Sequence, residues 1–146
     1  MYLISYRGNI NEPTSINENR PYDVTEALKQ GFHCWVDVWF HEGRLYLGSN
    51  EPKYVIKPTF VNIFSLWCNA MNFETLLELR RVKAVNYFQY RGTPTLTNRD
   101  YIISDKVIEG YEKDTIIFTN DPVYKELPFK GIISPTISVL VYVYYL

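Results

Sequence analysis

The sequence predicts an α/β fold in which parallel strands are joined by helical crossovers. In the first 90 residues, short apolar runs of β-forming residues alternate with two segments of helical pattern. This alternation is typical of strand–helix–strand units with right-handed connections. After residue 90 the β-like runs continue with little helix between them. We therefore expect the same sheet to continue with its helices shortened to loops.

The first predicted strand covers residues 2–6, an apolar run. A polar, Asn-rich loop follows at residues 8–21, and loops of this length are usually functional. Residues 23–30 have the pattern of a helix, with Asp23 as its N-cap and Glu26 as the capping-box partner.

The next segments repeat the alternation. Aromatic and β-branched residues predict a strand over residues 32–40, and a Gly-containing turn predicts a hairpin with residues 44–47. A second helix is expected over residues 73–81, with Asn72 as its cap. The other predicted segments are a loop at 48–58 and strands at 62–68, 84–88, 101–104, 115–119, 132–134 and 138–145.

Composition and charge limit the class of protein. The chain has 146 residues, 47% hydrophobic and 21% charged, so we expect one globular domain over residues 1–146 and exclude disordered chains. The 15 Lys and Arg against 16 Asp and Glu argue against bulk nucleic-acid binding, which needs a basic excess. Two distant cysteines, Cys34 and Cys68, favour a reducing compartment such as the cytoplasm. The longest apolar stretch, residues 137–146, is about half of a membrane span, so none is expected.

Several short motifs occur in the order seen in one enzyme family. They read ISYRGN at residues 4–9, ENRP at 18–21, GFHCWVDVW at 31–39, LGSNEP at 47–52, LWCNAMN at 66–72 and TLTNRDYI at 95–102. Together they resemble the HRG, ENT, ExDVW and LGHDEP motifs of glycerophosphodiester phosphodiesterases, in particular the short viral and phage versions. The resemblance covers roughly residues 2–104. It implies a reduced TIM barrel of the phosphatidylinositol-phospholipase-C-like type, with few or short helices in the second half.

The ionisable residues of that family are almost all replaced. Tyr6 and Ser49 stand where the family has its general acid and base histidines, and Trp35 stands where it has a metal-binding glutamate. Asp37 retains the other acidic position, whereas Asn50 replaces the aspartate of the second motif. Two histidines of the short subgroup are also missing, and the residues in their places are Asn69 and Gln89.

These losses predict a pseudoenzyme without catalytic residues. A positioned acid or base contributes roughly 10²–10⁴-fold to the rate, and neither a tyrosine nor a serine replaces histidine at neutral pH. A hard divalent cation needs six to eight oxygen ligands, several of them carboxylates. Asp37 is the only candidate ligand, so no cofactor is expected beyond a weakly held divalent cation.

In TIM barrels the binding site lies at the carboxyl ends of the strands. By the resemblance, the candidate ligand-binding residues here are Tyr6, Arg7, Glu18, Asn19, Trp35, Asp37, Ser49, Asn50, Asn69 and Gln89. This set is polar, aromatic and nearly neutral, which suits a small phosphorylated or nucleotide-like ligand bound without hydrolysis. The resemblance to viral proteins suggests the sequestration of a signalling nucleotide in the host cytoplasm.

Other interpretations stay open at this stage. Arg7 can clamp a phosphate or form a salt bridge with Asp37 or Glu18, and Trp35 can stack on a ligand or belong to the core. If Trp35 fills the old pocket, the chain is a protein-interaction or oligomeric module, and an exposed C-terminal strand is one route to a homo-oligomer. A third alternative is a metal-dependent glycerophosphodiester phosphodiesterase with a rebuilt site. It would use Asp37, Glu51 or His41.

Overall fold

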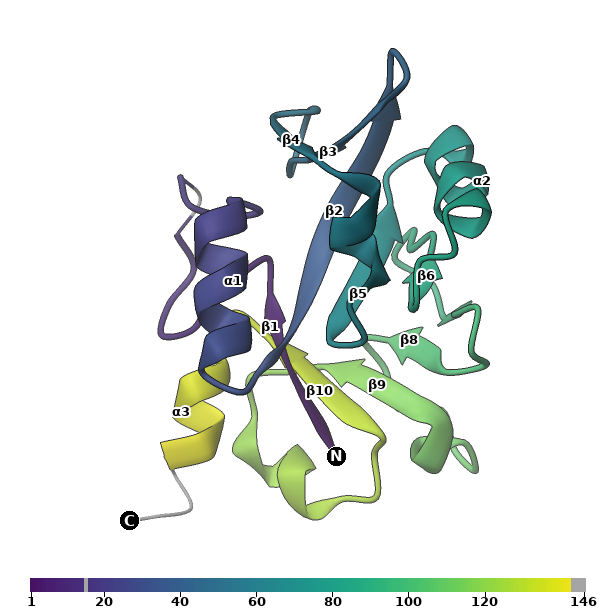
Figure 1. The fold of residues 1–146 in the computed structure, drawn as a ribbon. Coiled ribbons are helices and arrows are strands. Elements are labelled where there is room, and N and C mark those ends of the chain that lie inside the picture. Colours follow the sequence, from purple (N-terminus) through teal and green to yellow (C-terminus); the bar gives the residue numbers. More distant parts are fainter. Residues whose placement is uncertain (15, 143–146) are drawn as a thin grey trace.

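The described residues form a ten-stranded mixed sheet, which curls on itself (Figure 1). The computed structural model describes residues 1–14 and 16–142. The strands are β1 (Tyr2–Tyr6), β2 (His33–His41), β3 (Arg44–Leu47), β4 (Tyr54–Ile56), β5 (Leu66–Ala70), β6 (Tyr87–Phe88), β7 (Thr95–Leu96), β8 (Ile102–Ser104), β9 (Thr115–Phe118) and β10 (Gly131–Ser134). Their order is β4-β3-β2-β1-β10-β9-β8-β7, and β5 branches from β2 to pair with β6.

The predicted α/β fold, a reduced TIM barrel with few or short helices in its second half, is wrong, because the described residues form a mostly β, mixed sheet. In the described residues, α-helix is confined to α1 (Pro21–Lys29), α2 (Phe73–Arg81) and α3 (Ile137–Tyr142), and β3, β4 and β7 pair in antiparallel fashion. The second-half connections are too short or too interrupted for helices. Residues 89–94 join β6 to β7, and the later connections hold only the 3₁₀ turns η2 (Glu112–Asp114) and η3 (Pro122–Glu126). Glycine and proline in these connections disfavour longer helices.

Several elements of the first half match their predictions. β1, β3 and α2 have the predicted bounds. Asn72 caps α2, since its side chain accepts a hydrogen bond from the backbone N–H of Thr75 at 2.8 Å. The predicted cap of α1 is wrong: Arg20 occupies the N-cap position and Pro21 the first turn, where the fixed φ of proline suits a helix. Asp23 instead pairs with the Arg20 side chain.

Other boundaries differ from prediction. The loop expected at residues 48–58 contains β4, which extends the β2–β3 hairpin. The strand expected at 62–68 is shifted to β5 and preceded by the 3₁₀ turn η1 (Pro58–Asn62). Of the strand expected at 84–88, only β6 forms.

The C-terminal strand predicted over residues 138–145 is wrong as far as the structure describes it. Residues up to Tyr142 form α3, and residues 143–146 lie outside the described part. Ile137 and Leu140, one helical turn apart, pack against Ile117 and Ile132 on the outer face of β9 and β10. The predicted oligomeric contact therefore lacks the strand on which it depended. No helix among the described residues has the length and apolar character needed to span a membrane.

Two layers of core lie on opposite faces of the sheet. On the inner face, each of seven parallel strands contributes one buried apolar side chain, and these are Ile4, Trp35, Trp67, Phe88, Ile103, Ile116 and Ile133. On the outer face, α1 and α2 cover β2 and β5 through a second buried cluster that includes Val24, Val36 and Leu79. The aromatic side chains of this layer lie toward both ends of the strands: Phe88 ends β6, whereas Trp67 lies near the start of β5, beside Tyr2 and His33.

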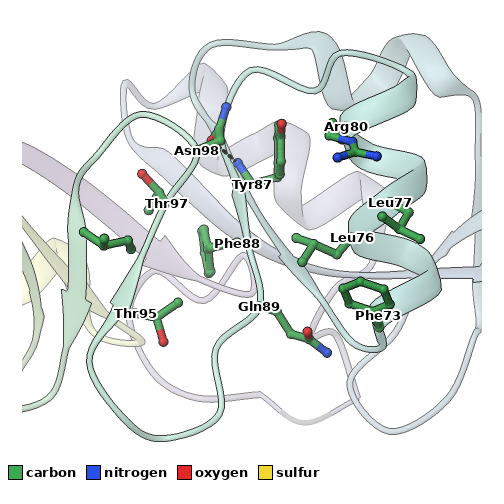
Figure 2. Close-up of a pocket in the computed structure, with 11 residues that line it drawn as sticks. Phe73, Leu76, Leu77, Arg80, Tyr87, Phe88, Gln89, Thr95, Thr97 and Asn98 are labelled. Carbon is green, nitrogen blue, oxygen red and sulfur yellow. Dashed lines mark hydrogen bonds between the residues drawn. The ribbon is translucent and has the colours of Figure 1, made fainter.

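Asn98 links the two ends of the curled sheet. Its backbone N–H donates to the carbonyl of Tyr87 at 3.0 Å, and its Oδ1 accepts from the N–H of Tyr87 at 2.7 Å (Figure 2). Its Nδ2 also donates to the carbonyl of Val85 at 2.9 Å. Asn98, just after β7, therefore bonds to the backbone of Tyr87 on β6 as a residue of a neighbouring strand would.

Candidate functional site

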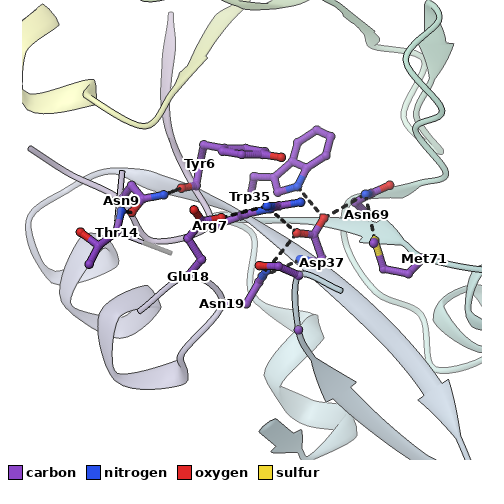
Figure 3. Close-up of polar contacts among 12 residues, drawn as sticks. Tyr6, Arg7, Asn9, Thr14, Glu18, Asn19, Trp35, Asp37, Asn69 and Met71 are labelled. Carbon is purple, nitrogen blue, oxygen red and sulfur yellow. Dashed lines mark hydrogen bonds and ion pairs between the residues drawn. The ribbon is translucent and has the colours of Figure 1, made fainter. Parts of the chain in front are cut away.

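The carboxylate of Asp37 is the centre of the polar cluster at the carboxyl ends of the strands (Figure 3). Its Oδ1 accepts hydrogen bonds from Trp35 Nε1 at 2.9 Å and Asn69 Nδ2 at 3.0 Å. Its Oδ2 accepts from Asn19 Nδ2 at 2.9 Å and lies 2.6 Å from Arg7 Nε. The Asp37 side chain is 1% exposed, so these protein groups replace bulk solvent around its carboxylate.

The strand geometry explains how three of these residues meet. Side chains two apart on a strand share a face, so Trp35 and Asp37 both point to the inner side of β2. Asn69 lies opposite Asp37 in the parallel β2–β5 pair. In the parallel β1–β2 pair, Tyr6 at the end of β1 lies opposite Trp35. The sequence of alternating inward residues therefore builds the cluster from three neighbouring strands.

Two loop residues complete the cluster from left-handed backbone conformations. Arg7 has φ 61° and Asn19 has φ 62°, values that are uncommon for non-glycine residues. The N–H of Arg7 donates to the carbonyl of Trp35, and the N–H of Asn19 donates to the carbonyl of Arg7, each at 2.9 Å. Asn19 Oδ1 in turn accepts from the N–H of Asp37 at 2.8 Å. Such conformations persist only where the surroundings hold them, as these hydrogen bonds do.

Arg7 forms ion pairs with two carboxylates. Its Nη1 donates to Glu18 at 2.9 Å, and its Nε contacts Asp37 as an ion pair without hydrogen-bond geometry. Burial disfavours the charged guanidinium, but the neighbouring carboxylates of Asp37 and Glu18 outweigh it and raise the pKa of Arg7. The Arg7 guanidinium is thus already paired with two carboxylates of the protein itself.

Aromatic rings fill the space beside the carboxylate. Trp35 is 1% exposed and packs against Tyr6, Tyr90, Phe88 and Phe118 with ring-centroid distances of 4.9–5.8 Å. Trp35 is therefore a core residue and presents no open stacking surface. Burial is also the main reason why the pKa of Tyr6 is raised, to about 12, so its phenol stays protonated at neutral pH.

The remaining predicted residues lie at or beyond the rim. Ser49 is half-buried, and its Oγ lies 3.0 Å from Asn19 Nδ2. Asn50 is exposed, and together with Ser49, Glu18 and two other residues it lines a hollow of about 110 Å³. Gln89 is not part of the cluster: it lines a separate groove beside α2 (Figure 2).

Tyr90 and Phe118 belong to the cluster but were not among the predicted site residues. The N–H of Tyr90 donates to Asn69 Oδ1 at 2.9 Å, which orients the amide that holds Asp37. Phe118 ends β9 and lies 5.4 Å from the Tyr90 ring. Both follow or end parallel strands of the inner layer, which is the signal that could have identified them.

The donors around Asp37 fit an anion and do not fit a metal ion. Each carboxylate oxygen faces N–H groups, and a guanidinium lies within ion-pair distance of one of them. A divalent cation at this position would meet positive charge and lack further carboxylates. In residues 1–14 and 16–142, no group of three or more His, Cys, Asp and Glu is placed to hold a metal. The carboxylate of Asp37 itself occupies the position where these donors would hold an anion.

Comparisons with known proteins found no relative of the chain. No protein-family model, no curated protein and no solved structure matches the chain. The resemblance to glycerophosphodiester phosphodiesterases therefore stays a prediction from short motifs.

Proposed function

We propose that the protein is a non-catalytic binding protein that contacts a partner protein through its outer surface. In this proposal the cluster around Asp37 supports the fold and does not bind substrate. The observation that carries it is the fully coordinated, buried carboxylate of Asp37, with three hydrogen-bond donors and one guanidinium around it.

The cluster lacks a free proton-transfer group. Catalysis of phosphodiester cleavage needs a base for the attacking oxygen and an acid for the leaving oxygen. Tyr6 stays protonated because its pKa is raised to about 12, and Asp37 is already held by four partners. In the described part of the chain, the side-chain hydrogen-bond partner of Ser49 is Asn19, and an amide cannot activate a hydroxyl.

A small phosphorylated ligand is less well supported by this geometry. The hollow next to the cluster measures about 110 Å³, whereas ligand pockets usually measure about 300–1,000 Å³. Glu18, Glu51 and Lys53 line it, so two negative charges against one positive charge make it a poor site for a phosphate. The donors of the cluster itself are already bound to Asp37.

The outer surface offers apolar contacts of the kind found in protein interfaces. Phe73 and Leu77 on α2 are 58% and 41% exposed, and Leu96 on β7 is 66% exposed. All three line one groove. Grouped exposed apolar side chains often mark interaction sites, whereas isolated ones are common on any surface.

The test combines turnover with a reporter inside the cluster. The purified protein is incubated with glycerophosphocholine and Ca²⁺ or Mg²⁺, and we expect no product above a protein-free control. In parallel, the indole N–H signal of Trp35 is followed by NMR during addition of glycerol phosphate or AMP, with the Trp39 indole as internal control. We expect no shift at Trp35. Turnover that is lost in Asp37→Asn, or a saturable shift confined to Trp35, would contradict the proposal.

A further inference from the structure

We propose that the groove between α2 and the β6–β7 segment binds an amphipathic helix of a partner protein, with an acidic side chain of that helix placed on Arg80. The inference rests on the proposed function and specifies the partner's chemistry. The groove has a volume of about 520 Å³ (Figure 2). Its lining residues are Phe73, Leu76, Leu77, Arg80, Tyr87, Phe88, Gln89, Thr95, Leu96, Thr97 and Asn98.

The groove is open because one connection lacks a helix. The β5–β6 connection carries α2, which covers the outer face of these strands, whereas residues 89–94 lead from β6 into β7 without helix. A sheet face of a domain is normally covered by another layer of secondary structure. Here the flank of α2 that faces β7 lies uncovered: Phe73 and Leu77 on α2 are exposed, and so is Leu96 on β7.

The spacing of the groove residues on α2 suits a second helix. Phe73, Leu76, Leu77 and Arg80 follow the i, i+3, i+4, i+7 pattern of one helical face. From Phe73 to Arg80 this face is about 10 Å long, or roughly two helical turns. Two packed helices lie about 8–10 Å apart and interdigitate side chains at this spacing.

An added strand is not favoured at this edge. Both backbone groups of Tyr87 on the free side of β6 are already bonded to Asn98. Strand addition depends on free backbone donors and acceptors along a sheet edge. A helix needs no such groups, because its backbone hydrogen bonds are internal.

Charge selects the kind of helix. Arg80 is the only charged residue in the groove lining, and the described residues give its guanidinium no hydrogen bond or ion pair. The nearby Glu78 is instead engaged by Arg81, at 2.9 Å from its Nε. A guanidinium beside an apolar surface pairs well with a carboxylate, which it can bind in two-point fashion. The partner helix is therefore apolar on one face and acidic at the position that meets Arg80.

The experiment uses two displayed peptide libraries of about 14 residues, roughly four helical turns. Both carry Leu in the i, i+3, i+4, i+7 pattern, and they differ only in a fixed Glu or a fixed Lys at the flanking position. Each is selected on the full chain. We expect binders from the Glu library and not from the Lys library.

Variants of the protein then locate the binding. We expect Leu77→Glu to weaken selected peptides by about tenfold or more, and Arg80→Glu to weaken Glu-library peptides while allowing selection from the Lys library. Val55→Glu, at another exposed apolar residue, is the matched control and should leave affinity unchanged. The melting temperature of each variant checks that it remains folded.

The outcomes separate this inference from the proposed function. Binders that are insensitive to Leu77→Glu, enrichment from the Lys library on the unmodified chain, or no binders at all would overturn the groove as the site. None of these results involves the Asp37 cluster. Failure of the proposed function appears independently, as phosphodiester turnover or as a phosphate-dependent shift at Trp35.

Discussion

Asn69 on β5 lies directly opposite Asp37 on β2, and its Nδ2 donates to Asp37 Oδ1 at 3.0 Å. The other end of the same amide accepts from the N–H of Tyr90 at 2.9 Å. Asn69 thus connects the buried carboxylate to the chain after β6. Such fully bonded polar groups inside a core are costly to break, because each remaining partner loses its hydrogen bond without gaining water.

Replacing the carboxylate should therefore destabilise the fold strongly. Asp37→Ala leaves the half-buried Arg7 with Glu18 as its one acidic partner among the described residues and removes the acceptor of three donors. We expect a loss of about 3 kcal/mol or more in the free energy of unfolding, measured by urea denaturation. Asp114→Ala, at an exposed carboxylate, is the control and should change it by about 0.5 kcal/mol or less. A loss near that of the control would show that the cluster is not structural.

The two left-handed residues allow backbone strain to be separated from hydrogen bonding. Asn19→Gly and Asn19→Ala both remove the contacts to Asp37 and Ser49, but only glycine accepts φ 62° freely. We expect Asn19→Ala to be less stable than Asn19→Gly by about 1 kcal/mol. Equal stabilities would mean that the backbone relaxes out of this conformation.

His33 should make stability depend on pH. Its Nδ1 accepts from Trp67 Nε1 at 3.0 Å, and burial lowers its pKa. A histidine with a lowered pKa in the folded state stabilises fully above its unfolded pKa of about 6.5. That contribution is lost as the pH falls through the lower folded value, because the unfolded chain takes up the proton first.

The measurement is the free energy of unfolding between about pH 7.5 and about pH 5, on either side of the unfolded value. His33→Gln should flatten this dependence, since glutamine can accept from Trp67 without titrating. His41→Gln is the matched control, because His41 is exposed. If both variants show the same pH dependence of the free energy of unfolding as the unmodified chain, titration of His33 does not contribute to it.

The hydrogen bonds of Asn98 should hold the β7 end of the sheet against β6. Asn98→Ala removes the bonds to the N–H of Tyr87 and the carbonyl of Val85. Both lie near solvent, so we expect a stability loss of only about 1 kcal/mol. Hydrogen exchange at the Tyr87 amide should nevertheless accelerate clearly, whereas Thr95→Ala should leave it unchanged. Unchanged exchange in Asn98→Ala would mean that the β7 end is held against β6 by other contacts.

The elements that the sequence predicted correctly are those whose local signals agree with their packing. The helix at residues 73–81 has both an N-cap and an apolar face that β5 and β6 bury. The fold class was wrong because β4 and β7 add antiparallel pairs that the motifs did not predict, which makes the sheet mixed and mostly β. The C-terminal β-branched run forms α3 because burial of Ile137 and Leu140 against β9 and β10 outweighs local preference.

The candidate site was predictable where it follows from strand alternation. Trp35 and Asp37 share one face of β2, so their proximity could be read from their spacing. The bonds from Asn19 and the replacement of a strand by Asn98 depend on loop conformations and long-range contacts, which spacing does not encode. Gln89 was misplaced because it follows the end of β6 and lines the groove beside α2 instead of the Asp37 cluster.

The most direct test of the closed cluster is hydrogen exchange of the Trp35 indole N–H. If the cluster is sealed, this proton exchanges only through global unfolding, and its protection equals the free energy of unfolding from urea denaturation. Exchange as fast as that of a solvent-exposed, unbonded indole would contradict the account, because it would reveal an opening beside Asp37 that a ligand could enter.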